Sequence, residues 1–432
     1  MDHPTRRDFL AHTGAAAAAA VLAGPSRADA ANDRIVAAVI GCGGMGTSHA
    51  RHLAERKDVS VAYLCDPDVS RAAAAAQAVE RVAGTKPQAV QDLRRVLDDK
   101  SVDAVWVATC DHWHAPATIL ACDAGKHVYV EKPCSHNVRE GRLMVEAARR
   151  HKRVVQVGTQ RRSSEWARQA IQALHEGVIG EVLVAKVWNS QQRVNIGKER
   201  PSDPPAHLDY DLWVGPAPMR PYQKNLHPYH WHWFYNFGTG DIGNDGVHQL
   251  DVARWGLGVE THPTSVAALG GKYFFDDDQE FPDTQYAVFE FTHGGKKKQI
   301  VYEQRLWSPY AQEGEGNGNA FYGTRGMMLL GRSGWQVYGH RNEPGPGGKG
   351  GVALAPHHAD FLECIRSGGT PRADIGINHL SSTLCHLGNI ATRVGRTLRF
   401  DPEREEIIGD EEASRLLRRT YREGHWAAPR GA

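Results

Sequence analysis

The feature that most constrains the fold of this 432-residue chain is a glycine cluster that separates two short apolar segments. Residues 35–40 are apolar, and Gly41-Cys42-Gly43-Gly44-Met45-Gly46 follows them. Residues 47–55 have a helical composition, and a second apolar run, 59–65, ends at Asp66. Glycines at this spacing let a strand turn tightly into a helix whose N-terminus can receive a pyrophosphate. The segment therefore predicts a βαβ unit of a Rossmann domain that binds a dinucleotide.

Asp66 stands where the second strand is expected to end, twenty residues after Gly46. A carboxylate at this place can accept hydrogen bonds from the adenosine ribose hydroxyls and would repel a 2′-phosphate. This favours NAD over NADP. The alternative interpretation is a purely structural glycine turn, with Asp66 capping the next helix.

Two sequence patterns divide the rest of the chain. Strand-like and helical segments alternate to about residue 160, which predicts a parallel sheet and an NAD-binding Rossmann domain over 31–160. Beyond about residue 180 come longer runs rich in Val, Tyr and Phe, which predict an α+β domain with a largely antiparallel open sheet. We expect its strands at 182–190, 264–274, 284–292, 298–306 and 327–331.

This second domain, 161–432, is expected to bind the substrate and to carry the oligomer contacts. The Gly/Pro-rich stretch 344–351 is expected to end the strands. Helices then resume at 357–367 and 377–394, and some of these are expected to pack back on the Rossmann domain. The long segment 192–262 is dense in Trp, His, Pro and Gly, which indicates a site-forming region.

Residues 1–30 have the pattern of a twin-arginine export signal. The Arg6-Arg7 pair precedes an alanine-rich run over 14–24, and Ala28-Asp29-Ala30 has the form of a cleavage site. We therefore expect a periplasmic or secreted protein; the alternative is a disordered tail with a chance arginine pair. No later segment has about 18 uninterrupted apolar residues, so no membrane insertion is expected.

The composition argues against a nucleic-acid partner. The net charge is +1, with 23% charged and 41% hydrophobic residues, so no strong field steers the protein toward a polyanion. The seven cysteines are odd in number and scattered. They are typical of reduced core residues rather than of a disulfide framework.

Two motifs follow the next strands of the predicted sheet. Thr109-Cys110-Asp111-His112-Trp113-His114 follows one strand, and Glu131-Lys132-Pro133 follows the next. They resemble the paired signatures of the Gfo/Idh/MocA family, the glucose-fructose oxidoreductase and inositol dehydrogenase type, in an exported twin-arginine subgroup. The resemblance covers nearly the whole chain after residue 30. It implies that Lys132 lies near the nicotinamide and the substrate hydroxyl, with a cis bond to Pro133.

The glycine turn and the resemblance together give the expected cofactor-binding residues. These are Gly41, Gly43, Gly44, Met45, Gly46, Asp66, Thr109, Asp111, His114, Glu131, Lys132 and Gln160. His112 and Trp113 are expected to pack against the cofactor.

Lys132, His248 and Asn244 are the candidate catalytic residues. A lysine at the carboxyl end of a parallel strand can help a substrate hydroxyl lose its proton; the alternative is a structural ion pair with Glu131. His248 lies in the expected first turn of a helix, and the family places an acid four residues before this histidine. Here that position is Asn244, which orients a hydroxyl but takes no proton at neutral pH. Lys132 and His248 could therefore share the transfer of the hydroxyl proton; the alternative is that His248 has a purely structural role.

Aromatic and histidine residues alternate over 229–235. Flat faces with hydrogen-bonding edges suit sugar rings, so we expect this run to line the substrate. A metal or haem site built from His227, His230, His232 or His112 is the alternative. No acid or thiolate lies at short spacing, so no metal is expected.

These observations predict an exported NAD(H)-dependent oxidoreductase that acts on a sugar or polyol with a tightly bound cofactor. The family is often dimeric or tetrameric, and an open sheet can pair face to face, so a homo-oligomer is expected. One alternative is an NAD-dependent glycoside hydrolase that oxidises, eliminates, hydrates and reduces. Another is a non-catalytic sugar-binding protein on the same scaffold.

Overall fold

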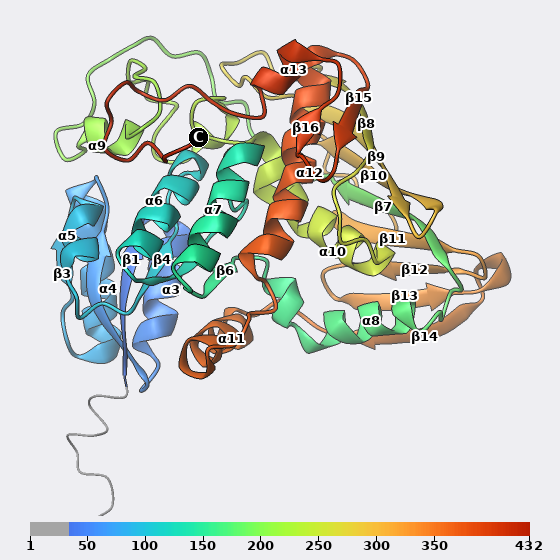
Figure 1. Cartoon of the computed structure of the whole chain (residues 1–432), viewed down its shortest axis with the longest axis horizontal. Helices are drawn as coiled ribbons and strands as arrows, with labels where there is room; N and C mark the ends of the chain where they lie inside the picture. Colours follow the sequence, from blue (N-terminus) through green and yellow to red (C-terminus); the bar gives the residue numbers. More distant parts are fainter. Residues whose placement is uncertain (1–33) are drawn as a thin grey trace, which may run out of the picture.

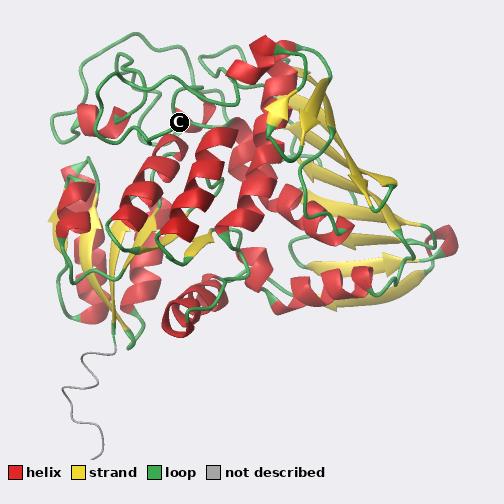
Figure 2. Cartoon of the chain, viewed as in Figure 1, coloured by secondary structure: helices red, strands yellow, loops and turns green. Residues whose placement is uncertain are grey.

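A computed structural model describes residues 34–432, so the predicted export signal over 1–30 lies outside the described residues. The described chain contains two sheets, with helices between them (Figures 1 and 2). The smaller sheet and its helices come from the first part of the chain, and the larger sheet comes from the second part.

The first sheet has the strand order of a Rossmann fold, β3-β2-β1-β4-β5-β6, with parallel pairing throughout. Its strands β4 and β5 are apolar and almost wholly buried, as expected where helices cover both faces of a parallel sheet. The prediction of a Rossmann domain is confirmed. Its elements are β1 (Ile35–Ile40), α3 (Gly44–Ala54), β2 (Val59–Cys65), α4 (Val69–Ala83), β3 (Gln88–Val90), α5 (Leu93–Asp98), β4 (Ala104–Val107), α6 (Asp111–Asp123), β5 (His127–Val130), α7 (Val138–Arg150) and β6 (Val155–Val157).

Helix α6 contains a proline in its interior. It begins at Asp111, and Pro116 lies inside it. Proline has no N–H to donate to the carbonyl four residues before it, which is that of His112. The Arg419 guanidinium donates to this carbonyl instead, at 2.7 Å. A contact from the far end of the chain therefore satisfies the group that proline leaves free.

The second sheet has ten strands in the order β14-β13-β12-β11-β7-β10-β9-β8-β15-β16, and β7–β10 is its parallel pair. The predicted antiparallel open sheet is confirmed. Its strands are β7 (Val182–Asn189), β8 (Ser265–Gly271), β9 (Thr284–His293), β10 (Lys296–Arg305), β11 (Asn317–Gly323), β12 (Met327–Leu330), β13 (Gly334–Tyr338), β14 (Pro344–Lys349), β15 (Leu398–Asp401) and β16 (Glu406–Ile407).

The expectation that residues 344–351 end the strands is wrong, because 344–349 form the edge strand β14 on β13. Prolines are tolerated at a sheet edge, where half of the backbone amides need no strand partner.

Helices cover one face of this sheet. In Figure 1, α8, α10 and α12 lie on the side that faces the Rossmann domain. The remaining elements are η1 (Gln160–Ser163), α8 (Glu165–His175), α9 (Tyr210–Val214), η2 (His230–Trp233), the π-helical turn η3 (Ile242–Gly246), α10 (Val247–Leu257), η4 (His340–Asn342), α11 (Leu354–Ser367), α12 (Ile375–Val394) and α13 (Glu411–Arg415). None of the helices in residues 34–432 is both long and apolar enough to cross a membrane.

Two C-terminal segments pack on the Rossmann domain. Phe361 and Leu362 of α11 belong to one buried cluster with the strands β1 and β4. Beyond α13, the chain runs back over the carboxyl ends of the parallel strands, and Figure 1 shows its end close to α6. This tail is held by Arg419, whose guanidinium also pairs with the fully buried Glu140. The tail thereby reaches the edge of the sheet where a dinucleotide is expected.

Candidate cofactor and substrate site

A cavity of about 400 Å³ lies at the carboxyl ends of the parallel strands. Three parts of the chain enclose it: the Rossmann domain, the segment 192–262 and the C-terminal tail. Among its lining residues are Gly41, Gly43, Gly44, Met45, Asp66, Arg71, Thr109, Asp111, His114, Glu131, Lys132, Trp213, His227, Tyr229, Trp231, His232, Asn244 and Trp426. Most of the predicted cofactor residues therefore meet at one cavity, in the crevice where such sheets bind ligands.

The glycine turn leaves no room for side chains at its two ends. Gly41 has a φ of +92°, which favours glycine. A Cβ on Gly46 would lie 1.8 Å from the carbonyl oxygen of Gly41, so Gly46 lies behind the turn and not among the lining residues. Helix α3 starts at Gly44, directly after the turn. The backbone is thus open to a phosphate at a helix N-terminus, and these residues fit a dinucleotide.

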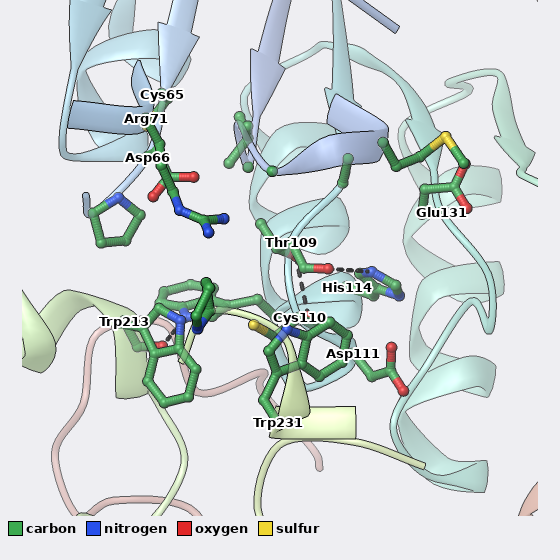
Figure 3. A pocket seen from close by; sticks show the side chains of 18 of the residues that line it. Cys65, Asp66, Arg71, Thr109, Cys110, Asp111, His114, Glu131, Trp213 and Trp231 are labelled. Carbon is green, nitrogen blue, oxygen red and sulfur yellow. Dashed lines mark hydrogen bonds between the residues drawn. The ribbon is translucent and has the colours of Figure 1, made fainter. Parts of the chain in front are cut away.

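Asp66 and Arg71 lie at the same end of the cavity, as Figure 3 shows. One Asp66 oxygen accepts the Cys42 amide at 2.7 Å, and the other accepts the Asp68 amide at 2.9 Å. Burial raises the pKa of this carboxyl. Each oxygen keeps a further acceptor site for a ribose hydroxyl.

Arg71 was not among the predicted residues. It lies in the first turn of α4, and its guanidinium lies beside Gly43, 3.4 Å from where a Cβ would stand. A cation there suits a pyrophosphate. A sequence signal could have identified Arg71. It stands five residues after Asp66, in the first turn of the helix that Asp68 caps.

Lys132 and Asn244 meet across the two domains. The Lys132–Pro133 bond is cis, as the resemblance implied. Lys132 Nζ donates to the Asn244 main-chain oxygen at 2.8 Å and to its Oδ1 at 3.3 Å. The Asn244 Nδ2 in turn donates to Oδ1 of the buried Asp241 at 3.2 Å. An aspartate at 244 would have no hydrogen to give Asp241, so the amide suits both of its neighbours.

The same network continues away from the cavity. Arg193 donates to Asp241 at 2.8 Å and is also paired with Asp245. Burial and the charge of Asp241 raise the pKa of Asp245, while Arg193 opposes this rise. Asp245 is therefore committed to Arg193, and it does not take the place of the acid that Asn244 replaces.

Glu131 belongs to a buried chain of polar groups. Its Oε1 lies 3.0 Å from His49 Nε2, and His49 Nδ1 lies 2.9 Å from His358 Nε2. Its Oε2 accepts the Lys132 amide at 3.2 Å. Burial by itself would raise the pKa of Glu131, but His49 and Lys132 lower it to about 2. Glu131 thus fixes the backbone of Lys132 and carries a buried negative charge.

The other predicted residues are placed as follows. Asp111 is buried and accepts the Thr239 hydroxyl at 2.6 Å. His114 directs its ring nitrogens at the carbonyls of Pro133 and Thr109, at 2.6 and 3.1 Å, the latter drawn in Figure 3. Gln160 lies outside the lining, 3.5 Å from the Tyr129 hydroxyl.

His248 and the signature residues His112 and Trp113 also have distinct places. His248 is in the first turn of α10, as expected, but does not line the cavity. It is close enough to Lys132 that burial and this charge lower its pKa to about 3. Trp113 lines the cavity, whereas His112 is buried against the carbonyl of Trp213 at 3.1 Å.

The histidine-rich segment does not bring together groups for a metal. Within residues 34–432, the one group of three potential ligands is His262, His379 and Glu405. Both Nε2 atoms lie within 2.8 Å of Glu405 Oε1, which Arg142 also contacts. These hydrogen bonds account for the cluster without a metal.

Two models of one oxidoreductase family match the chain. "Oxidoreductase family, NAD-binding Rossmann fold" matches residues 35–159. "Oxidoreductase family, C-terminal alpha/beta domain" matches residues 182–286 and 352–428. The chain belongs to the Gfo/Idh/MocA family. Its first domain is an NAD-binding Rossmann domain.

Curated relatives match part of the chain. Inositol 2-dehydrogenase 2 of Saccharopolyspora erythraea is 32% identical over 258 residues, which are 59% of this chain and 63% of that protein. Levoglucosan dehydrogenase of Pseudarthrobacter phenanthrenivorans is 27% identical over 167 residues, 39% of this chain and 36% of its own length. The chain thus spans less than two thirds of these relatives.

Solved structures share the fold over most of the chain. Aldose-aldose oxidoreductase from Caulobacter crescentus aligns with a TM-score of 0.64 and 18% identity, covering 85% of this chain and 100% of that one. Levoglucosan dehydrogenase in complex with NADH and levoglucosan aligns with a TM-score of 0.65 and 18% identity, covering 85% and 99%. At this identity the likeness establishes the common fold.

The Glu131–His49 pair predicts a pH-dependent contribution to stability. The folded pKa is lowered to about 2. The charged carboxylate therefore stabilises the fold above its unfolded pKa of about 4.3, and this contribution is lost as pH falls toward the folded value. Glu131→Gln should lower the free energy of unfolding at pH 7 by about 3 kcal/mol, and the difference should shrink between pH 5 and pH 3. Urea unfolding across this range, with the exposed Glu55→Gln as control, measures it; a difference that does not change with pH contradicts the assignment.

Proposed function

We propose that this protein is an NAD(H)-dependent oxidoreductase that transfers hydride to or from a secondary alcohol carbon of a sugar or polyol. The observation that carries the proposal is the single cavity that joins Asp66 and the glycine turn to Lys132, Asn244 and an aromatic wall. Dinucleotide-binding groups and hydroxyl-binding groups thereby share one enclosed space. The relatives support a polyol or sugar substrate, since one is named for inositol and another for levoglucosan.

The enclosure of the cavity supports a cofactor that stays bound. Trp426 of the tail lines it, and the Arg94 guanidinium lies 4.5 Å from its ring centroid. Arg422 of the same tail pairs with Asp211 of α9 at 2.6 Å. Release of a dinucleotide therefore requires the tail to leave α5 and α9, two elements that it links.

We also propose that the protein is exported by the twin-arginine route to the periplasm or beyond. The arginine pair, the alanine-rich run and the small-residue cleavage pattern of residues 1–30 support this. This route carries folded proteins, so the cofactor would be loaded before export. Because the periplasm offers no soluble pool of NAD, a retained cofactor and a redox-neutral cycle go together.

Two alternatives are testable against the leading proposal. In an NAD-dependent glycoside hydrolase, the same cavity would oxidise a glycoside transiently and expel its aglycone. In a non-catalytic binding protein, the Asn244 position would mark a lost acid. The intact glycine turn and the Lys132–Asn244 contact favour an enzyme over the binding protein.

We propose in addition that the protein forms a homo-oligomer through the outer face of the large sheet. Leu269 pairs with Tyr286 across β8 and β9, and these side chains are 73% and 45% exposed. Their strand neighbours Ala287 and Phe289 are fully buried on the inner face. Outward-facing apolar side chains on two neighbouring strands of one sheet are consistent with an interface.

One prediction of the proposed function concerns cofactor retention. Purified wild-type protein should release about one NAD(H) per chain on denaturation, and added myo-inositol, levoglucosan or D-glucose should change the absorbance of the bound cofactor. Trp426→Ala should weaken NAD binding by about 10-fold, since an indole that is 37% exposed contributes only part of the roughly 1.5–3 kcal/mol of a fully buried side chain. Ligand content after dialysis measures this, with the exposed Tyr310→Ala as control. If the protein neither contains nor binds NAD, both the oxidoreductase and the glycoside hydrolase hypotheses are ruled out.

A second prediction separates the two enzyme schemes. Holoenzyme incubated with 4-nitrophenyl glycosides and no added NAD should accumulate bound NADH or remain unchanged, without release of 4-nitrophenol. Release that Lys132→Ala abolishes would instead establish the glycoside hydrolase.

A third prediction concerns the outer sheet face. Leu269→Lys with Tyr286→Lys should convert a dimer or tetramer to a monomer, because like charges on both copies would be buried in the interface without matched partners. Multi-angle light scattering measures the mass. Val82→Glu, at an exposed position of α4, is the control. A wild-type monomer, or a double variant of unchanged mass, contradicts the interface.

A further inference from the structure

His232 lies beside Lys132 in a closely packed position, and it is not part of the family signature. It lies in the short 3-10 turn η2, half-buried, and lines the cavity together with Lys132 and Asn244. Its ring stacks on that of Trp231, with centroids 3.6 Å apart and planes at 19°. A Cβ on Gly238 would lie 2.2 Å from the His232 carbonyl oxygen, so the next turn packs directly on this backbone. Stacking and close packing together hold the imidazole in one orientation.

The main chain fixes which ring nitrogen carries hydrogen. His232 Nδ1 lies 2.6 Å from the carbonyl oxygen of Tyr229. A carbonyl can only accept, so Nδ1 carries the hydrogen, and a neutral imidazole then has a lone pair on Nε2. Among residues 34–432 no hydrogen-bond partner contacts Nε2. A proton acceptor is therefore left free on a ring that lines the cavity.

His114, Glu131 and Lys132 itself are already engaged in hydrogen bonds. His114 directs both ring nitrogens at main-chain carbonyls. Glu131 holds His49 and the Lys132 amide, and Lys132 itself donates to Asn244. His248, the acid–base residue that the resemblance implies, lies outside the lining.

We propose that His232 Nε2 accepts the proton of the substrate hydroxyl, so that His232 is a catalytic residue of this site. The inference rests on the proposed function. The hydroxyl O–H bond breaks and its proton forms an N–H bond at Nε2. The electron pair of the neighbouring C–H bond leaves as hydride to the oxidised nicotinamide, so the carbinol carbon is oxidised to a ketone. In the return step Nε2 gives the same proton back to the carbonyl oxygen as hydride returns.

The charge state of the ring is set by burial and by its charged neighbours. Burial lowers the pKa of His232 to about 3, the Tyr229 carbonyl opposes the shift, and the charges of Lys132, Arg193 and His230 add to it. The ring is therefore neutral, and able to accept, throughout the neutral range. Once protonated beside Lys132, it is driven to give the proton back.

His232→Asn tests the proposal. An asparagine amide can keep the N–H to the Tyr229 carbonyl but has no basic nitrogen. With myo-inositol, levoglucosan or D-glucose, whichever the wild type oxidises, kcat should fall by about 10²–10⁴-fold. Bound NAD, KM and Tm should stay close to wild type. His230→Asn, in the same turn but outside the lining, is the matched control, and His248→Asn measures the share of the other histidine.

A second readout does not depend on turnover. ¹⁵N-histidine NMR at pH 7 should show, as the resonance pair missing from His232→Asn, a neutral ring protonated at Nδ1. A ring protonated at Nε2, or a kcat within threefold of wild type in His232→Asn, overturns the proposal. The proposal is also overturned if His248→Asn loses activity while His232→Asn keeps it. A wild type that binds NAD but oxidises none of the probes defeats the proposed function itself, and the acid–base assignment falls with it.

Discussion

The contact on which the site depends is the pair of hydrogen bonds from Lys132 Nζ to Asn244. Lys132 ends a strand of the Rossmann sheet, and Asn244 lies in the π-helical turn that leads into α10 of the second domain. The two bonds therefore set where the hydroxyl-binding groups stand relative to the cofactor cavity. Glu131 fixes the lysine backbone from behind through a bond to its amide. This contact links the two domains directly, since it joins residues 112 apart in the sequence.

Charge balance explains why an amide stands at position 244. Lys132 and Arg193 bring two cations to this region, and Asp241 and Asp245 bring two carboxylates. A third carboxylate at 244 would add an uncompensated buried charge, which is costly in a low-dielectric interior. Asn244 instead accepts from Lys132 and donates to Asp241. The residue that departs from the family pattern is thus the one that the neighbouring charges require.

The sequence carried the Rossmann order, the antiparallel sheet and most of the cavity lining, because these depend on local spacing. Parallel strands end at one edge of a sheet, so motifs that follow Ile40, Val107 and Val130 must meet there. Contacts made between distant segments gave no such signal. Three features depend on contacts that form only in the folded protein. They are the place of Trp426 in the cavity lining, the tautomer of His232, and the hydrogen bond from Arg419 to the His112 carbonyl. The same reason explains why α6 continues through Pro116, since the Arg419 guanidinium replaces the donor that proline lacks.

A cavity covered by the tail supports the redox-neutral cycle that we propose. The tail contacts at Arg94 and Asp211 hold the chain over the dinucleotide end of this cavity. A second substrate bound in the same place could take back the hydride of a retained cofactor, which requires no external redox partner. Net oxidation, by contrast, would require the tail contacts at Arg94 and Asp211 to open in every cycle.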